Sequence, residues 1–276
     1  MHRSMRILWL SAIFLLVIPK AFAAEILTND AVIKAMRKAS AASSAPPAPA
    51  AQAGPEAMQT AIALYRQEKV VEAEAAFETL LVQSPGDDGL KVWKALAILE
   101  QARVKKDARE SGYKPLVVKA YAILQPLGRR IPDNADWNFA MAKAFWMNDR
   151  PTWAGRAAKT ALRVRADFAE PQILLGDLAY DADAQDLAMP AGSPQRQAAM
   201  MWPGINARKE YEKALAMLGL AAPLQAEVLY KLGKVTADLE KNPAAAREYW
   251  TRAVAADAGC RYGAMAQQTL QAAPGK

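Results

Sequence analysis

The chain has 276 residues, a formal net charge of +7, one histidine and one cysteine. Acidic and basic residues are interspersed, and no basic stripe of the kind that binds nucleic acid is visible, so we expect no nucleic-acid partner. Cys260 has no second cysteine to pair with inside the chain, and its neighbours Arg261 and Tyr262 do not mark a catalytic thiol. We expect a structural or incidental role for this thiol, with an intermolecular disulfide as the alternative.

Residues 1–23 have the pattern of a secretory signal peptide. Basic residues precede an apolar run over 7–18, and an A-x-A cleavage sequence ends at Ala23. The run is too short to span a bilayer, so we predict cleavage after Ala23 and a secreted chain in the bacterial periplasm, with a retained anchor as the alternative. Cleavage removes His2 and three basic residues but no acid. The mature chain then carries a net charge of +4 and lacks histidine, the commonest general base and metal ligand.

Two short segments are expected before the folded domain. Residues 24–38 predict an amphipathic helix with Thr28 as its N-cap and Leu27 packing on Val32. This helix could be a docking peptide, or it could pack against the chain's own repeats. Residues 39–55 are rich in Ala, Ser and Pro, which predicts an extended linker. We therefore expect a folded domain over 56–271 and a short tail over 272–276.

The folded domain is predicted to be a set of helical hairpins. One spacing recurs, with a small residue, then a large one four positions on, then another small or apolar residue three further. Small residues let two helix backbones approach, and large ones fill the space between them. Pro85 and Pro132 mark the ends of repeats, and Asn242-Pro243 marks a helix start inside a hairpin. The copies begin at five alanines, of which the third follows the second by 34 residues: Ala73, Ala120, Ala154, Ala207 and Ala246.

The clearest copy, residues 229–254, resembles the tetratricopeptide repeat, a helical hairpin with the signature W-x2-L-G-x2-Y, A-x3-F and P. Leu232-Gly233 and Ala246-x3-Trp250 match the signature, whereas Leu229 and Thr236 stand at the Trp and Tyr positions. The resemblance implies an all-α fold, a superhelical stack of about five hairpins with a C-terminal capping helix. That cap is expected at about 261–271.

The resemblance also implies a concave groove that is lined by the first helix of each hairpin and binds a protein or peptide. A groove of aromatic and basic residues suits an extended or helical peptide with some acidic character. The carboxylate clamp found in part of this family is not expected, because Met58 and Ile62 stand where it needs polar groups. The predicted groove residues are Tyr65, Arg66, Lys94, Lys143, Trp146, Asp177, Tyr180, Tyr230, Lys234 and Asp238.

Two insertions interrupt the repeats, at 103–114 and at 182–205. The second carries Met200, Met201 and Trp202, which could form an adaptable binding surface or could pack the loop back onto its neighbours.

No catalytic or phosphate-binding motif is present in the sequence. Asp181, Asp183 and Asp186 lack the spacing of a calcium loop, so solvated carboxylates are the preferred interpretation. We therefore predict no enzymatic activity, no cofactor and no metal. The predicted function is a secreted or periplasmic scaffold that binds a protein partner in envelope assembly, secretion or export. The alternatives are a glycan-binding or peptidoglycan-binding repeat protein, and an enzyme with an unrecognised site.

Overall fold

The computed structural model describes residues 54–190, 207–217 and 219–272. These residues belong to one compact unit of the chain. Several predictions lie outside them: the signal peptide, the helix at 24–38, the linker up to residue 53, the tail from 273, and the insertion surface of Met200, Met201 and Trp202. No helix within the described residues has both the length and the apolar character that crossing a membrane requires.

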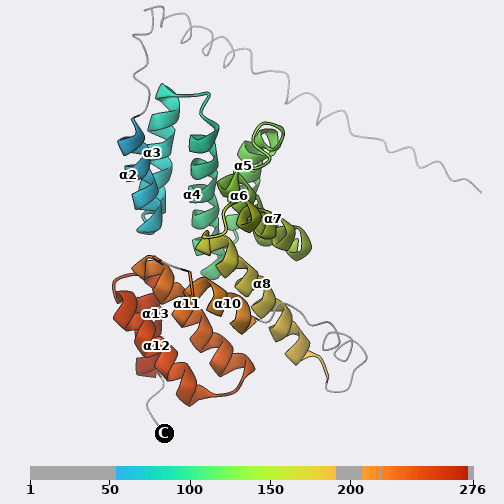
Figure 1. Cartoon of the computed structure of the whole chain (residues 1–276), viewed down its shortest axis with the longest axis vertical. Helices are drawn as coiled ribbons and strands as arrows, with labels where there is room; N and C mark the ends of the chain where they lie inside the picture. The colour runs from blue at the N-terminus through green and yellow to red at the C-terminus, as the bar shows by residue number, and fades with distance from the viewer. Residues whose placement is uncertain (1–53, 191–206, 218, 273–276) are drawn as a thin grey trace, which may run out of the picture. The chain divides into compact units, whose positions relative to one another are not determined.

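The described residues form helices and no strands, which confirms the all-α prediction (Figure 1). Five hairpins follow one another, and α13 (Arg261–Ala272) packs on the last of them. A short 3₁₀ turn (Gln125–Arg129) follows α5, and a π turn (Val235–Leu239) extends α11. The hairpins pair α2 (Pro55–Arg66) with α3 (Val70–Gln83), α4 (Asp88–Asp107) with α5 (Tyr113–Leu124), α6 (Ala135–Met147) with α7 (Pro151–Val164), α8 (Ala169–Ala188) with α10 (Ala207–Leu215), and α11 (Ala222–Lys234) with α12 (Pro243–Asp257).

Local sequence explains where many helices begin. The side chains of Asp87, Asn134 and Asn242 cap α4, α6 and α12, each accepting a backbone N–H three residues on at 2.8–3.1 Å. Proline occupies the first turn of α2, α7 and α12, where its missing N–H costs nothing. Both insertions contribute to helices: residues 103–107 are the end of α4, and 182–188 are the end of α8.

The turns inside four hairpins share a feature that the sequence did not reveal. One residue in each turn has a positive φ of 55–62°, a conformation that glycine adopts easily and other residues adopt at a cost. In the first turn, the N–H of Glu68 bonds to Tyr65 O and the N–H of Lys69 bonds to Leu64 O, which closes the end of α2. None of these four turn residues is a glycine: they are Glu68, Arg109, Asp149 and Lys241.

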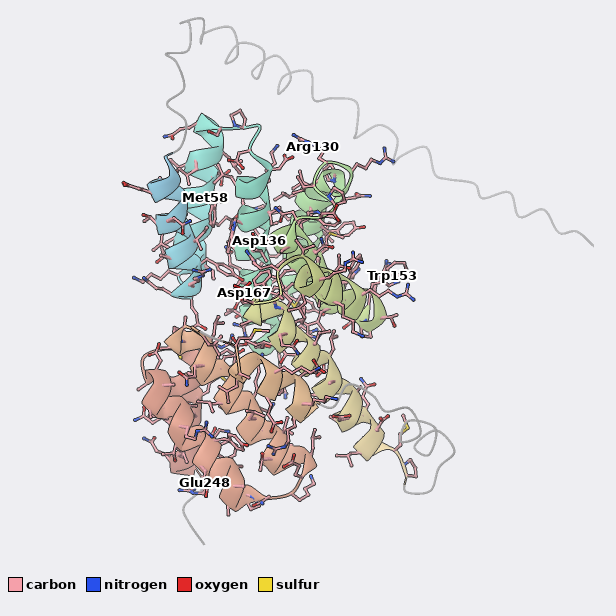
Figure 2. All side chains as sticks on the ribbon, viewed as in Figure 1. Met58, Arg130, Asp136, Trp153, Asp167 and Glu248 are labelled. Atoms are coloured by element: carbon pink, nitrogen blue, oxygen red, sulfur yellow. The ribbon has the colours of Figure 1, made fainter. Side chains whose placement is uncertain are left out.

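Small and large residues pack between the helices as the repeat spacing requires. A Cβ atom on Gly176 would overlap the ring of Tyr211, and one on Gly233 would overlap the ring of Trp250. Tyr211 and Trp250 are both buried. By contrast, Trp153 lies on the outer side of α7 (Figure 2) and is 55% exposed. In α8 and α11, the glycine of the first helix therefore leaves the space into which the aromatic ring of the second helix fits.

Candidate functional site

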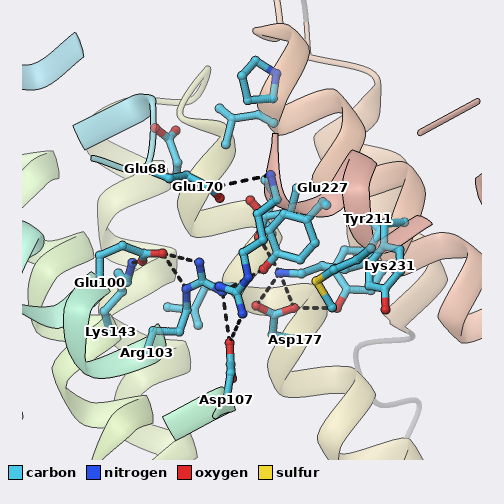
Figure 3. Close-up of a pocket in the computed structure, with 18 of the residues that line it drawn as sticks. Glu68, Glu100, Arg103, Asp107, Lys143, Glu170, Asp177, Tyr211, Glu227 and Lys231 are labelled. Carbon is cyan, nitrogen blue, oxygen red and sulfur yellow. Dashed lines mark hydrogen bonds and ion pairs between the residues drawn. The ribbon is translucent and has the colours of Figure 1, made fainter. Parts of the chain in front are cut away.

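The first helices of all five hairpins line one cavity of about 390 Å³. The C-terminal half of α4, the middle of α6 and most of α8 contribute to it, together with the end of α2 and the length of α11 (Figure 3). Because these side chains stand on helices that pack against their hairpin partners, they project from regular elements and not from loops. Eight of the predicted groove residues line it: Tyr65, Arg66, Lys143, Trp146, Asp177, Tyr180, Tyr230 and Lys234.

The other two predicted groove residues do not line the cavity. Lys94 lies nearer the start of α4 than the cavity does, and its ammonium pairs with Glu78 of α3 at 3.3 Å. Asp238 lies in the π turn after α11 and accepts a hydrogen bond from the Tyr180 hydroxyl at 2.5 Å. Asp238 therefore contacts a cavity residue from outside the lining. Lys94 lies outside the cavity because the α4 residues that line it, from Glu100 on, belong to the second half of that helix.

Helix α13 does more than cover the last hairpin. Its first residue, Arg261, donates its backbone N–H to the Glu68 carboxylate at 3.2 Å and pairs its guanidinium with Asp107 at 2.6 Å. The next residue, Tyr262, accepts a hydrogen bond from Arg103 at 3.0 Å. These contacts tie the end of the domain to its beginning. The site is therefore a pocket closed on one side by α13, and the groove that the resemblance implied is not open along its length.

One buried ionic cluster lies on the α4 and α6 side of the pocket (Figure 3). The Glu100 carboxylate pairs with Lys143 at 2.6 Å and with Arg103, and Lys143 also donates to the Tyr65 hydroxyl at 3.4 Å. Burial alone would raise the pKa of Glu100, but Lys143 and then Arg103 hold it well below its usual range. Burial raises the pKa of Tyr65 to about 12, so its hydroxyl keeps its proton.

A second cluster lies between α8 and α11. The Lys231 ammonium pairs with Asp177 at 2.8 Å and with Glu227 at 2.7 Å, and the Tyr211 hydroxyl donates to Asp177 at 2.7 Å. Burial opposes the charge on Lys231, but the two carboxylates raise its pKa well above the usual value. The basic residues of the pocket are thus largely neutralised, and the prediction of a mainly aromatic and basic groove is incomplete.

Three charged groups that line the pocket form few ion pairs or hydrogen bonds with other described residues. Among the described residues, Glu170 in the first turn of α8 forms no ion pair, although its carboxylate accepts its own backbone N–H. Burial raises the pKa of Glu170, and more distant Arg66 and Arg165 only partly offset this. Arg261 has a buried Nη1 atom for which the described residues provide no hydrogen-bond partner. The Lys234 ammonium lies 4.9 Å from the centre of the Tyr180 ring.

Sequence reasoning missed the acidic half of the pocket. A signal was present, because Glu100 interrupts an apolar run in α4 and lies three residues before Arg103, while Glu227 lies four residues before Lys231. The residues missed are Glu68, Glu100, Arg103, Asp107, Glu170, Tyr211, Glu227, Lys231, Arg261 and Tyr262.

Within the part of the chain that the structure describes, no group of three His, Cys, Asp or Glu side chains could hold a metal ion. Asp183 instead accepts the backbone N–H of Ala207 at 3.4 Å. Cys260 is partly buried, its Sγ donates to the Asp257 carbonyl at 3.2 Å, and burial raises the pKa of its thiol. This thiol is therefore poorly activated as a nucleophile.

No protein-family model and no curated protein matches the sequence. Among solved structures, the chain is similar to the crystal structure of a candidate protein binding protein from Bacteroides ovatus ATCC 8483, with 17% identity and a TM-score of 0.26. That similarity covers 73% of this chain and 96% of the other. A similarity of this size identifies neither a family nor a ligand for this chain.

Proposed function

We propose that the helical domain is a binding module of the tetratricopeptide type that takes a short segment of a protein partner into its pocket. The observation that carries this proposal is the cavity of about 390 Å³ to which the first helix of every hairpin contributes. Its volume falls within the range of sites that enclose a small ligand. It suits a few side chains of a partner, and it is too small for a whole docked helix.

The pocket is also suited to recognition by its surface chemistry. Trp146, Tyr180 and Tyr230 offer aromatic faces, and aromatic residues are enriched among those that dominate binding energy. Charged groups beside them set the orientation of a partner more than its affinity. We propose further that the chain works outside the cytoplasm, as a scaffold or adaptor in envelope assembly, secretion or export. Fractionation of producing cells tests this location, with a mature N-terminus at Ala24 in a soluble envelope fraction as the expected result.

The binding proposal is tested by partner capture from an envelope extract. A triple variant, Tyr180→Ala, Tyr230→Ala and Lys234→Ala, removes two aromatic rings and one cation from the pocket. The matched control, Tyr121→Ala, Trp153→Ala and Arg156→Ala, removes the same kinds of side chain from α5 and α7, outside the pocket. All proteins are first compared for thermal stability.

We expect the pocket variant to lose a protein partner that the wild type and the control retain. Truncation of one central aromatic residue typically costs at least about 2 kcal/mol, or some thirtyfold in affinity. Equal capture by all three proteins would contradict the proposal. Capture of a polysaccharide in place of a protein, lost only in the pocket variant, would replace the proposal with glycan binding.

A further inference from the structure

We propose that the pocket receives a basic side chain of the partner, whose ammonium or guanidinium group pairs with Glu170 while the adjoining backbone carbonyl accepts a hydrogen bond from Arg261 Nη1. This inference rests on the proposed function and specifies the chemistry of the segment that is bound.

The two ionic clusters of the pocket balance their own charges. Three carboxylates, on Glu100, Asp177 and Glu227, have ion pairs with three cations, on Arg103, Lys143 and Lys231. These six groups neutralise one another without help. Glu170 is a further carboxyl group of the lining, and no cation of the described residues lies within ion-pair distance of it. Glu170 is partly removed from water, and such a carboxylate is costly without a counter-ion, so a cation supplied by a ligand would be favoured there.

Several acidic groups of the lining lie on one side of the pocket. Figure 3 shows Glu68, Glu170 and Glu227 on the same side of the pocket, away from Asp107. Glu227 lies close enough to Glu170 to raise its pKa further, and Glu68 accepts only a backbone N–H from Arg261. An anionic ligand group at this end would meet three carboxyl groups. A cationic one would reduce the repulsion between Glu170 and Glu227.

Helix α13 contributes an unsatisfied hydrogen-bond donor. Arg261 Nη1 is buried and has no hydrogen-bond partner among the described residues, although the same guanidinium pairs with Asp107 through Nη2. Buried donors are normally satisfied, so an acceptor is expected from a ligand. A bare ammonium ion or a metal cation brings no acceptor. A basic residue within a peptide brings a carbonyl oxygen and a cation together.

Aromatic rings form part of the pocket wall. The rings of Tyr65 and Tyr262 line the pocket, and Lys231 already lies 5.5 Å from the centre of the Tyr262 ring. Aromatic faces attract organic cations and also pack against the methylene groups of a long basic side chain. The pocket can therefore hold the apolar stem and the charged end of such a side chain.

The test uses four blocked amino acids as probes with the full chain: N-acetyl-arginine amide, N-acetyl-lysine amide, N-acetyl-norleucine amide and N-acetyl-glutamate amide. Dissociation constants are measured by titration for the wild type, for Glu170→Gln, and for Glu72→Gln as a control on the exposed face of α3. Both substitutions remove one negative charge and keep the side-chain shape. Magnesium chloride is titrated separately at matched ionic strength.

We expect the arginine and lysine probes to bind about tenfold more tightly than the norleucine probe, as one charge-assisted contact would give. The preference should be lost in Glu170→Gln and kept in Glu72→Gln. Tighter binding of the glutamate probe, an unchanged preference in Glu170→Gln, or displacement of the probes by magnesium would each overturn the inference. If partner capture still depends on the pocket in such a case, the proposed function stands and only its basic side chain is wrong.

Discussion

The space between paired helices and the inside of the pocket are both buried, but different residue types fill them. Between helices, Gly233 faces Trp250 and alanines separate the larger side chains, so shape alone determines the fit. In the pocket, Glu100 and Lys143 are 8% and 7% exposed and are stabilised by each other. The first region stabilises the fold by removing apolar surface from water. The second stays stable only while each charge keeps its partner.

This difference assigns the two faces of each first helix to different tasks. In α11, Gly233 and Leu229 face α12, whereas Glu227, Tyr230 and Lys231 face the pocket. A substitution on the packing face should therefore change stability through volume. A substitution on the pocket face should change it through charge, and should change binding as well.

The largest expected effect is on the packing face. Trp250 fills the space beside Gly233 and its Nε1 donates to Tyr230 O at 3.3 Å, so Trp250→Ala should lower the free energy of unfolding by about 3–5 kcal/mol. Trp153→Ala, at a 55% exposed position, should change it by less than about 0.5 kcal/mol. Denaturant unfolding measures both. Similar losses in the two variants would mean that the ring of Trp250 is not a packing element.

The next effect concerns the pocket. Lys143→Met removes one partner of the buried Glu100 carboxylate, and such a change should cost about 3 kcal/mol. Lys105→Met breaks an exposed pair with Glu110 and should cost less than about 1 kcal/mol. Because Lys143 and Arg103 hold the pKa of Glu100 well below its usual range, the pair should contribute fully above about pH 4.3 and lose its contribution as the pH falls further. A constant difference between wild type and Lys143→Met at all pH values would contradict this.

Sequence predicted the packing face well because its rule is local and repeated. The spacing from Ala246 to Trp250 recurs at Ala207 and Tyr211, and each alanine and aromatic ring is buried where the spacing places it. The positive φ angles were not predicted, since Glu, Arg, Asp and Lys occupy the position instead of glycine.

The pocket was predicted only in part, because its ion pairs join residues that are close in space but far apart in the sequence. Lys143 pairs with Glu100, which lies 43 residues away in the sequence, and Lys231 pairs with Asp177, which lies 54 residues away. Arg261 meets Glu68 across 193 residues. No spacing in the sequence reports such pairs, and hence the closure by α13 emerged only from the structure. The position of a side chain on a first helix could be predicted, whereas the identity of its partner could not.

A smaller effect is expected when a residue of the packing face is enlarged instead of truncated. Gly233→Ala adds one methyl group where the Trp250 ring lies, and it should cost about 1–3 kcal/mol. Gly86→Ala is the matched control, because no atom lies within 4 Å of the added carbon. Combining Gly233→Ala with Trp250→Phe should cost less than the sum of the two single changes, since the smaller ring leaves room. Strict additivity in denaturant unfolding would show that the two residues do not share the space.

The hairpin turns should tolerate a substitution of a larger residue by glycine. Arg109→Gly relieves a φ of 59° at an exposed turn, so it should raise the free energy of unfolding by about 0.5–1 kcal/mol. Lys159→Gly, in the middle of α7, should lower it by about 1 kcal/mol. If both glycines destabilise equally, the strain inferred at residue 109 is absent.

The smallest expected effect is on the pH dependence of thermal stability, and it tests whether the Glu170 carboxylate is available to a ligand. Burial raises the pKa of Glu170, with Glu227 adding to the rise and Arg66 and Arg165 opposing it. A raised pKa means that the wild type keeps its full stability below the unfolded-state value of about 4.3 and loses some as the pH rises through the folded-state value. Glu170→Gln stays neutral, so it should melt at a higher temperature than the wild type at pH 8 and at the same temperature near pH 4.

The exposed Glu72→Gln should follow the wild-type melting curve at both pH values. Addition of N-acetyl-arginine amide at pH 8 should stabilise the wild type and not Glu170→Gln, because only the wild type presents a carboxylate to the guanidinium. A lower melting temperature for Glu170→Gln at pH 8 without the probe would show that Glu170 already has a stabilising partner. In that case the pocket would have no unpaired carboxylate, and a basic side chain would gain nothing by entering it.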